Sequence, residues 1–133
     1  MVERHGIELL IVDYLQRVRN PSAKTREREV AEVSGLLKDM ALVHDIPVIA
    51  LCQLNRAVET RQKKTPTLAD LRDSGQIEQD ADIVIFLHRD NPQAKSGPVD
   101  LIFAKGRNIG TGKVRLFWDG DRMTFHDIED RKG

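Results

Sequence analysis

The sequence is poor in the features that mark secreted, membrane and zinc-binding proteins. Cys52 is its single cysteine, so no internal disulfide can form, and a lone thiol within an apolar run indicates a reducing compartment. No apolar run approaches the roughly 20 residues needed to cross a bilayer, and residues 1–5 do not form a signal peptide. The four histidines show no metal-ligand spacing. These absences predict a cytoplasmic protein without a zinc site or membrane contact.

An excess of charge of one sign is also missing, because 21 Lys and Arg balance 21 Asp and Glu. Net charge therefore indicates neither a nucleic acid nor a membrane partner, and any DNA-binding surface must be local. Basic residues gather at 17–28 and 56–64, where they could follow a phosphate backbone or simply be solvated. The length predicts one modest domain with one core, at 1–126, and a frayed tail at 127–133.

The third missing feature is a phosphate-binding loop. Residues 106–114 look like one at first, because Gly112 precedes Lys113. However, Arg107 stands where the first glycine is required, and Val114 follows the lysine. We interpret this segment as the tip of a hairpin, and no other segment matches the phosphate-loop pattern.

The chain does contain short apolar runs separated by polar segments. Residues 7–12 are typical of a strand buried on both faces of a parallel sheet. Apolar residues from 30 to 43 recur at helical spacing and predict a helix that ends near His44 and covers the sheet. Residues 48–52 predict a second strand. Strand, helix and strand in this order indicate a parallel crossover and an α/β fold.

The second half of the chain predicts smaller elements. Thr67 and Asp70 have the spacing of a helix start, so one or two short helices should precede Asp82. Strands are predicted at 83–87 and 99–104, with a turn-rich connection at 91–98. A hairpin should join residues 113–118 to 123–126.

Polar residues that directly follow the apolar runs are candidates for chemistry, because ligands of open α/β sheets bind beyond the carboxyl ends of the strands. Asp13 could hold a hydrated Mg²⁺ near nucleotide phosphates, or only cap its strand. Gln53 could bond a γ-phosphate or orient water, although alone it reads as a turn residue. Their pairing within one crossover favours a nucleotide site.

Lys105 and Arg107 end the fourth predicted strand. In extended geometry their side chains leave on the same face. Two fixed cations can neutralise charge on a transferring phosphoryl group, although a solvated strand end is the simpler alternative.

Four strings of the sequence closely resemble successive motifs of the DnaB family of bacterial and phage replicative helicases, in the family's order. They are LIVDYLQ (10–16), LCQLNR (51–56), DLRDSGQIEQDAD (70–82) and AKGRN (104–108). The resemblance covers nearly the whole chain. It implies the carboxyl-terminal half of a RecA-like ATPase domain of the P-loop NTPase class, truncated before the Walker B strand. A mainly parallel sheet with covering helices and a C-terminal β-hairpin should result.

The resemblance also implies nucleotide-site roles, with ATP and Mg²⁺ as cofactors. Asp13 matches the Walker B aspartate that holds Mg²⁺. Gln53 matches the polar sensor that couples nucleotide state to the DNA loops. Arg107, with Lys105 beside it, matches the finger that reaches into the neighbouring subunit's nucleotide site.

Further matches imply contact with single-stranded DNA. Arg72, Asp73 and Gly75 match a loop that lines the central channel of the ring, and Arg26 and Arg28 belong to another channel-facing segment. The implied partners are single-stranded DNA, the chain itself or full-length helicase subunits in a hexameric ring, a helicase loader and primase.

The departures from the family qualify these roles. The family's phosphate loop, the glutamate that polarises the attacking water and the collar domain all lie upstream of the Walker B strand, and we find no replacement for them. Gly106 stands where many relatives carry glutamine, and Ile109 where many carry glycine. A bare strand at 7–12 should also favour self-association.

We therefore expect part of an ATP-dependent helicase that unwinds DNA by translocating on a single strand, and that is inactive alone. Phosphate affinity in this class comes mostly from the missing loop. One alternative is a non-catalytic module, such as a prophage remnant, that docks on intact helicase subunits. A recombinase-like strand-exchange ATPase half is another, against which residues 70–82 argue.

Overall fold

The computed structural model describes residues 6–128, apart from the side chains of residues 72–74. These residues form two compact units, so the expectation of one core is wrong. The first unit contains the described residues up to 57 together with 68–81, and the second contains 58–67 with the described residues from 82 onward. Chain length could not reveal this division, because it depends on which strands pair.

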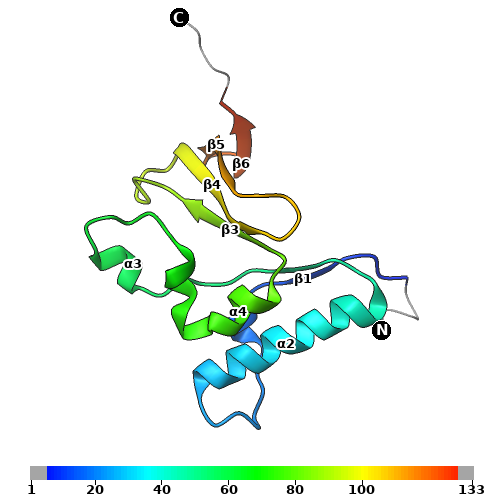
Figure 1. Cartoon of the computed structure of the whole chain (residues 1–133). Helices are drawn as coiled ribbons and strands as arrows, with labels where there is room; N and C mark the ends of the chain where they lie inside the picture. Colours follow the sequence, from blue (N-terminus) through cyan, green and yellow to red (C-terminus); the bar gives the residue numbers. More distant parts are fainter. Residues whose placement is uncertain (1–5, 129–133) are drawn as a thin grey trace, which may run out of the picture. The chain divides into compact units, whose positions relative to one another are not determined.

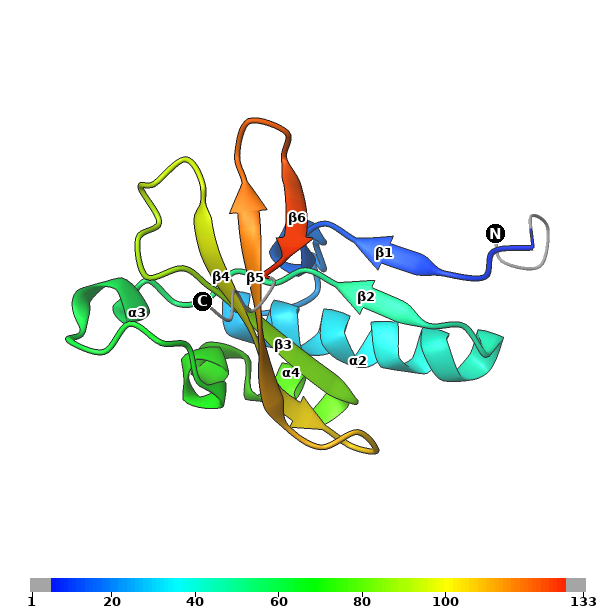
Figure 2. The ribbon, with the colours of Figure 1, turned by 90° about the horizontal axis from the view of Figure 1, so that it is seen from above.

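The first unit contains the predicted strand, helix and strand crossover (Figure 2). β1 (Leu10–Val12) pairs in parallel with β2 (Val48–Ala50). Between them lie a short 3₁₀ helix, η1 (Leu15–Arg17), and the long helix α2 (Arg26–His44). Among the described residues, no helix combines the length and the apolar character that a membrane span requires.

Two further short helices complete the first unit, as the sequence predicts before Asp82. They are the 3₁₀ helix η2 (Leu68–Ser74) and α4 (Gly75–Asp80). The Ser34 hydroxyl on α2 donates a hydrogen bond to the Asp80 carboxylate at 2.7 Å, which ties α4 to α2. The core of this unit consists of Leu15, Val30 and Val33, against which Leu37 and Ile77 pack.

β1 is not buried on both faces, which corrects the prediction for residues 7–12. Within the described residues β1 pairs with β2 alone, and Ile11 is 58% exposed. The predicted apolar stripe of α2 is also only partly buried, because Leu36 and Val43 are exposed. An apolar run predicts that an element forms, but it does not identify what covers the element.

The second unit is a four-stranded antiparallel sheet in the order β3–β4–β5–β6 (Figure 1). The strands are Ile83–His88, Gly97–Gly106, Gly112–Asp119 and Thr124–Asp127. The α/β class is confirmed, but the mainly parallel sheet is wrong for these strands. The reason is the short connection at 89–96, because a parallel crossover takes about a dozen residues or more. The segment before them, which showed no period, contains the one-turn helix α3 (Ala57–Thr60).

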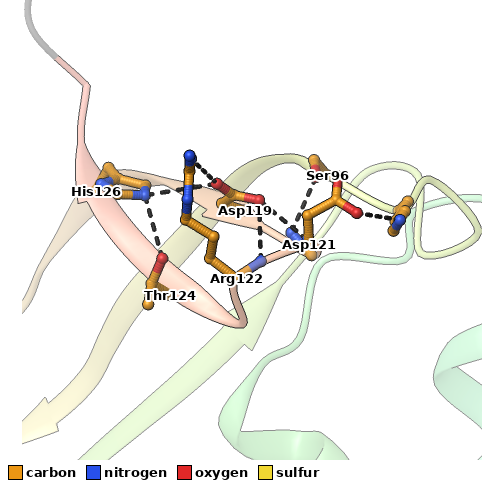
Figure 3. Close-up of polar contacts among 8 residues, drawn as sticks. Ser96, Asp119, Asp121, Arg122, Thr124 and His126 are labelled. Atoms are coloured by element: carbon orange, nitrogen blue, oxygen red, sulfur yellow. Dashed lines mark hydrogen bonds and ion pairs between the residues drawn. The ribbon is translucent and has the colours of Figure 1, made fainter.

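The predicted hairpin is confirmed as β5 and β6, and Figure 3 shows the contacts that hold its turn. The Asp119 carboxylate accepts hydrogen bonds from the backbone N–H groups of Asp121 at 3.0 Å and Arg122 at 3.3 Å. Although partial burial raises the pKa of Asp119, these bonds and the Arg122 guanidinium hold it below its usual value. The Ser96 hydroxyl accepts from the Gly120 N–H at 2.9 Å, which links the turn to the β3–β4 connection.

Asp100 is the buried acid of the antiparallel sheet. It stands opposite Arg115 in the β4–β5 register and accepts hydrogen bonds from Arg115 Nε at 2.7 Å and Nη2 at 3.0 Å. Lys113 Nζ lies 3.4 Å from the same carboxylate. The Arg115 hydrogen bonds outweigh burial and hold the pKa of Asp100 below its usual value.

We expect the second unit to lose stability in acid through Asp100. Because its pKa is lower in the folded chain than in the unfolded one, its stabilisation is fully present above about pH 4 and disappears as the pH falls through the folded-state value. Fluorescence of Trp118, the one tryptophan, can follow unfolding in urea at several pH values. Asp100→Asn should lower stability at neutral pH and flatten this acid dependence. An unchanged dependence would assign it to other carboxylates.

Candidate nucleotide and DNA site

The structure places Asp13 and Gln53 at the same edge of the first unit, as their positions after β1 and β2 predict. The backbone ladder continues beyond both strands, because the Leu51 N–H donates to Val12 O at 2.9 Å and the Leu15 N–H donates to Leu51 O at 2.7 Å. Asp13 and Gln53 are both exposed, and the peptide bond that follows Asp13 is cis. A ligand in solvent therefore has access to the carboxylate and to the amide.

The side chain of Gln16 joins the two segments that follow these strands. Its Nε2 donates hydrogen bonds to Gln53 O and Cys52 Sγ, each at 3.0 Å, and its Oε1 accepts one from the Gln53 N–H at 3.2 Å. Burial raises the pKa of the Cys52 thiol, and the Gln16 hydrogen bond opposes that shift. Sequence reasoning did not single out Gln16. The available signal was its place in the motif that also contains Asp13.

A pocket of about 230 Å³ opens beside Gln53. Its lining comes from the strand end, from the start of α2 and from η2, and consists of Gln16, Gln53, Leu54, Asn55, Arg26, Glu27, Val30, Asp70 and Leu71. The pocket therefore joins Gln53, the candidate nucleotide sensor, to Arg26, a candidate DNA contact. Their separation in the sequence gave no indication of this proximity.

The basic segment at 17–28 is part loop and part helix. Because α2 begins at Arg26, both Arg26 and Arg28 lie on its first turn instead of in the predicted loop. Arg26 pairs with Glu29, and Arg28 pairs with Glu32 at 3.1 Å. Glu29, which is 8% exposed, also accepts a hydrogen bond from the Asn20 N–H at 2.6 Å, and this bond is the main cause of its lowered pKa. These contacts order the segment, and its contact with DNA stays a prediction.

The other predicted DNA contacts lie at the junction of η2 and α4. The backbone of Arg72 and Asp73 belongs to η2, but their side chains lie outside the described part of the chain. Gly75 begins α4, and a Cβ added there would have no atom within 4 Å. The DNA-binding role of these residues also stays a prediction.

Lys105 and Arg107 belong to the second unit. Lys105 is the penultimate residue of β4 and pairs with Val84. Arg107 follows the strand, and its N–H donates to Asp82 O at 2.8 Å, while its Nη1 lies 2.8 Å from the Asp82 carboxylate. The two side chains of this ion pair are 51% and 56% exposed. The candidate finger is therefore held at its base by the main chain and at its tip by an exposed acid.

The two departures noted in this loop, Gly106 and Ile109, lie against each other. A Cβ on Gly106 would sit 2.6 Å from Ile109 Cγ1 and 2.5 Å from Gly110 O. A larger residue at position 106 would therefore displace the loop that follows Arg107. The glycine makes room for the isoleucine, so the two departures compensate sterically.

The donor set at Asp13 fits a hydrated Mg²⁺ held together with phosphate oxygens. A carboxylate at an exposed strand end is the hard oxygen ligand that Mg²⁺ accepts, with waters completing its coordination. Within the described residues there is no group of three or more His, Cys, Asp or Glu that could enclose a metal ion. The residues therefore fit a shared ion and not a closed metal centre.

A parallel crossover with an acid and an amide at its strand ends, followed by antiparallel strands, defines the RecA-like ATPase class of α/β domains. The chain belongs to the DnaB-like helicase C terminal domain family, whose profile matches residues 1–127. Both the fold class and the family inferred from the motifs are thereby confirmed.

Three relatives show how much of a longer protein this chain corresponds to. The replicative DNA helicase DnaB of Leifsonia xyli subsp. xyli (strain CTCB07) is 46% identical over 133 residues, which cover 95% of this chain and 29% of that protein. A solved structure of an isolated ATPase domain has a TM-score of 0.83 and 41% identity, covering 91% of this chain and 44% of that one. The structure of a DnaB-like replicative helicase and its interactions with primase has a TM-score of 0.82 and 41% identity, covering 91% and 31%. The chain thus spans less than a third of its curated relative.

Proposed function

We propose that this chain is part of an ATP-dependent replicative DNA helicase, which unwinds duplex DNA by moving along one strand as a hexameric ring. The observation that carries the proposal is the pair of strand-end residues Asp13 and Gln53, with a pocket that extends from Gln53 to Arg26. Family membership supports the same activity. Such work on DNA would take place in the cytoplasm.

In this proposal each site residue has a distinct role in handling ATP. Asp13 holds Mg²⁺, which neutralises charge on the phosphates when it is bound. Gln53 bonds the γ-phosphate through its side-chain amide. Lys105 and Arg107 stabilise the charge that develops on the nucleotide of a neighbouring subunit.

The pocket beside Gln53 supports a route from nucleotide to DNA. A shift of Gln53 on loss of the γ-phosphate would change a cavity whose other walls are Arg26 of α2 and Asp70 and Leu71 of η2. We propose that α2 and the loop of Arg72, Asp73 and Gly75 contact the phosphates of single-stranded DNA. Primase, which appears with one structural relative, and a helicase loader are the further proposed partners.

The chain alone should neither bind ATP tightly nor hydrolyse it. No segment of its sequence matches a phosphate loop, and phosphate affinity in this class comes mostly from the backbone N–H groups and lysine of such a loop. Activity should therefore require the complementary segment of a longer protein.

A chimera tests the proposal directly. Residues 6–128 would replace the aligned segment of the Leifsonia xyli helicase, and ATP hydrolysis would be measured with and without single-stranded DNA, together with duplex unwinding. We expect DNA-stimulated hydrolysis and unwinding from the chimera and neither from the isolated chain. A hexameric chimera that binds ATP but shows no hydrolysis would contradict the proposal.

A second candidate is a non-catalytic partner that docks on intact helicase subunits and presents Lys105 and Arg107 to their nucleotides. The missing phosphate-loop sequence favours it, because such a chain could act only through another protein. Adding the isolated chain to the intact Leifsonia xyli helicase should then change its ATPase rate. No change at saturating amounts would exclude this candidate.

A further inference from the structure

We propose that Gln16 is a positioning residue, which fixes the backbone of Gln53 so that the Gln53 side chain meets the nucleotide in a defined place. The inference rests on the proposed nucleotide site and adds to it a residue that acts through Gln53. Its basis is the set of hydrogen bonds that the Gln16 amide makes to Gln53 and Cys52.

The side chain of Gln16 substitutes for a peptide group. A primary amide carries one carbonyl acceptor and N–H donors, the same groups as the main chain. Gln16 uses both on a single residue, because its Nε2 donates to Gln53 O and its Oε1 accepts from the Gln53 N–H. This reciprocal pair has the pattern of a hydrogen-bonded pair between neighbouring strands.

A substitute is needed here because the backbone ladder ends just before Gln53. Its last bond in this direction joins the Leu15 N–H to Leu51 O, and the chain then turns into η1, where the Arg17 N–H bonds Tyr14 O. The backbone after Leu15 is therefore directed away from the segment that follows β2. The Gln16 side chain continues the pairing that its own backbone leaves.

The arrangement anchors the main chain of Gln53 while leaving its side chain available to a ligand. Both backbone groups of Gln53 are bonded to Gln16, whereas the structure records no hydrogen bond to the Gln53 side-chain amide within the part of the chain that it describes. Gln53 also lines the pocket and is exposed. A fixed backbone with a free amide is the arrangement that preorganises a phosphate contact.

Amide hydrogen exchange on the isolated chain tests the geometry. Gln16→Ala removes all of these bonds, so the Gln53 N–H should exchange at least about 10-fold faster, the effect of losing roughly 1.4 kcal/mol of protection. Gln76→Ala is a matched control, because its Nε2 donates to Asp80 at 2.8 Å in the same unit without touching Gln53. Equal exchange of Gln53 in the parent chain and in Gln16→Ala would overturn the proposal.

Kinetics of the chimera test the functional consequence. Gln16→Ala should lower kcat by roughly 10-fold to 100-fold while leaving KM for ATP within about threefold, since a small misplacement of a catalytic contact is costly and most phosphate affinity arises elsewhere. A normal kcat in Gln16→Ala would overturn the positioning role. A parent chimera that cannot hydrolyse ATP would instead overturn the proposed function, and the exchange experiment would still decide whether Gln16 anchors Gln53.

Gln16→Glu provides a readout that a purely structural role would not give. The introduced carboxylate can still accept the Gln53 N–H, but it cannot donate to Gln53 O or Cys52 Sγ until it is protonated. The kcat of this variant, relative to the parent, should therefore rise as the pH falls toward the usual carboxyl pKa of about 4.3. A ratio that is independent of pH would contradict the donor role of Nε2.

Discussion

Arg107→Ala should abolish ATP hydrolysis in an assembled ring while leaving nucleotide binding intact. In the proposed function Arg107 stabilises charge only as the γ-phosphoryl group transfers, and an arginine in this role accelerates hydrolysis by roughly 10³-fold to 10⁵-fold. The binding of ATP depends on other groups, so its dissociation constant should change little. Steady-state hydrolysis by the chimera and titration with a fluorescent ATP analogue would measure the two quantities separately.

Two further variants make the Arg107 result specific. Arg122→Ala removes another arginine of the second unit, one that pairs with Asp119 in the hairpin turn, and it should leave the rate of hydrolysis unchanged. Arg107→Lys keeps the charge but loses the planar fork of donors, so it should restore only part of the rate. If nucleotide binding were lost in Arg107→Ala, the assignment of Arg107 as the finger would be wrong.

The ion pair with Asp82 is compatible with this role. An exposed pair contributes only about 0–1 kcal/mol, because water screens it, so transferring the guanidinium to a phosphate costs little. The hydrogen bond from the Arg107 N–H to Asp82 O does not involve the guanidinium and can persist during the transfer. The loop can therefore hold its base in place while the side chain changes partner.

The local elements of this fold followed from the sequence, whereas the pairing of the later strands did not. The helical spacing between residues 30 and 43 predicted α2, and the turn residues at 119–122 predicted the β5–β6 hairpin. Both signals are local. The antiparallel pairing of β3 with β4 depends on the length of the connection at 89–96, which an apolar run does not encode.

The candidate site shows the same limit. Asp13 and Gln53 could be predicted because each directly follows an apolar run, and parallel strands end at the same edge. Gln16 could not, because its importance lies in hydrogen bonds to a residue 37 positions away. The pairing of Arg26 with Glu29 was equally hidden, since the sequence alone placed that arginine in a loop.

Gly120→Ala should strongly destabilise the second unit. A Cβ at this position would lie 2.0 Å from the carbonyl oxygen of Lys95 and 2.9 Å from its carbonyl carbon, and a backbone group cannot move aside as a flexible side-chain end can. Relief requires the turn to separate from the β3–β4 connection, which breaks the hydrogen bond from the Gly120 N–H to the Ser96 hydroxyl. We expect a loss of about 3 kcal/mol or more in the free energy of unfolding.

Trp118 makes this loss measurable, because it lies in β5 next to the turn and its ring centroid is 4.8 Å from that of Phe125. Urea titrations followed by its fluorescence would give the free energy of unfolding of each variant. Gly112→Ala is the matched control: it lies in the same strand, and its added Cβ would have no atom within 4 Å, so the change should stay within about 0.5 kcal/mol. Equal stabilities for the two variants would mean that the turn and the Lys95 carbonyl are not in the close contact on which this prediction depends.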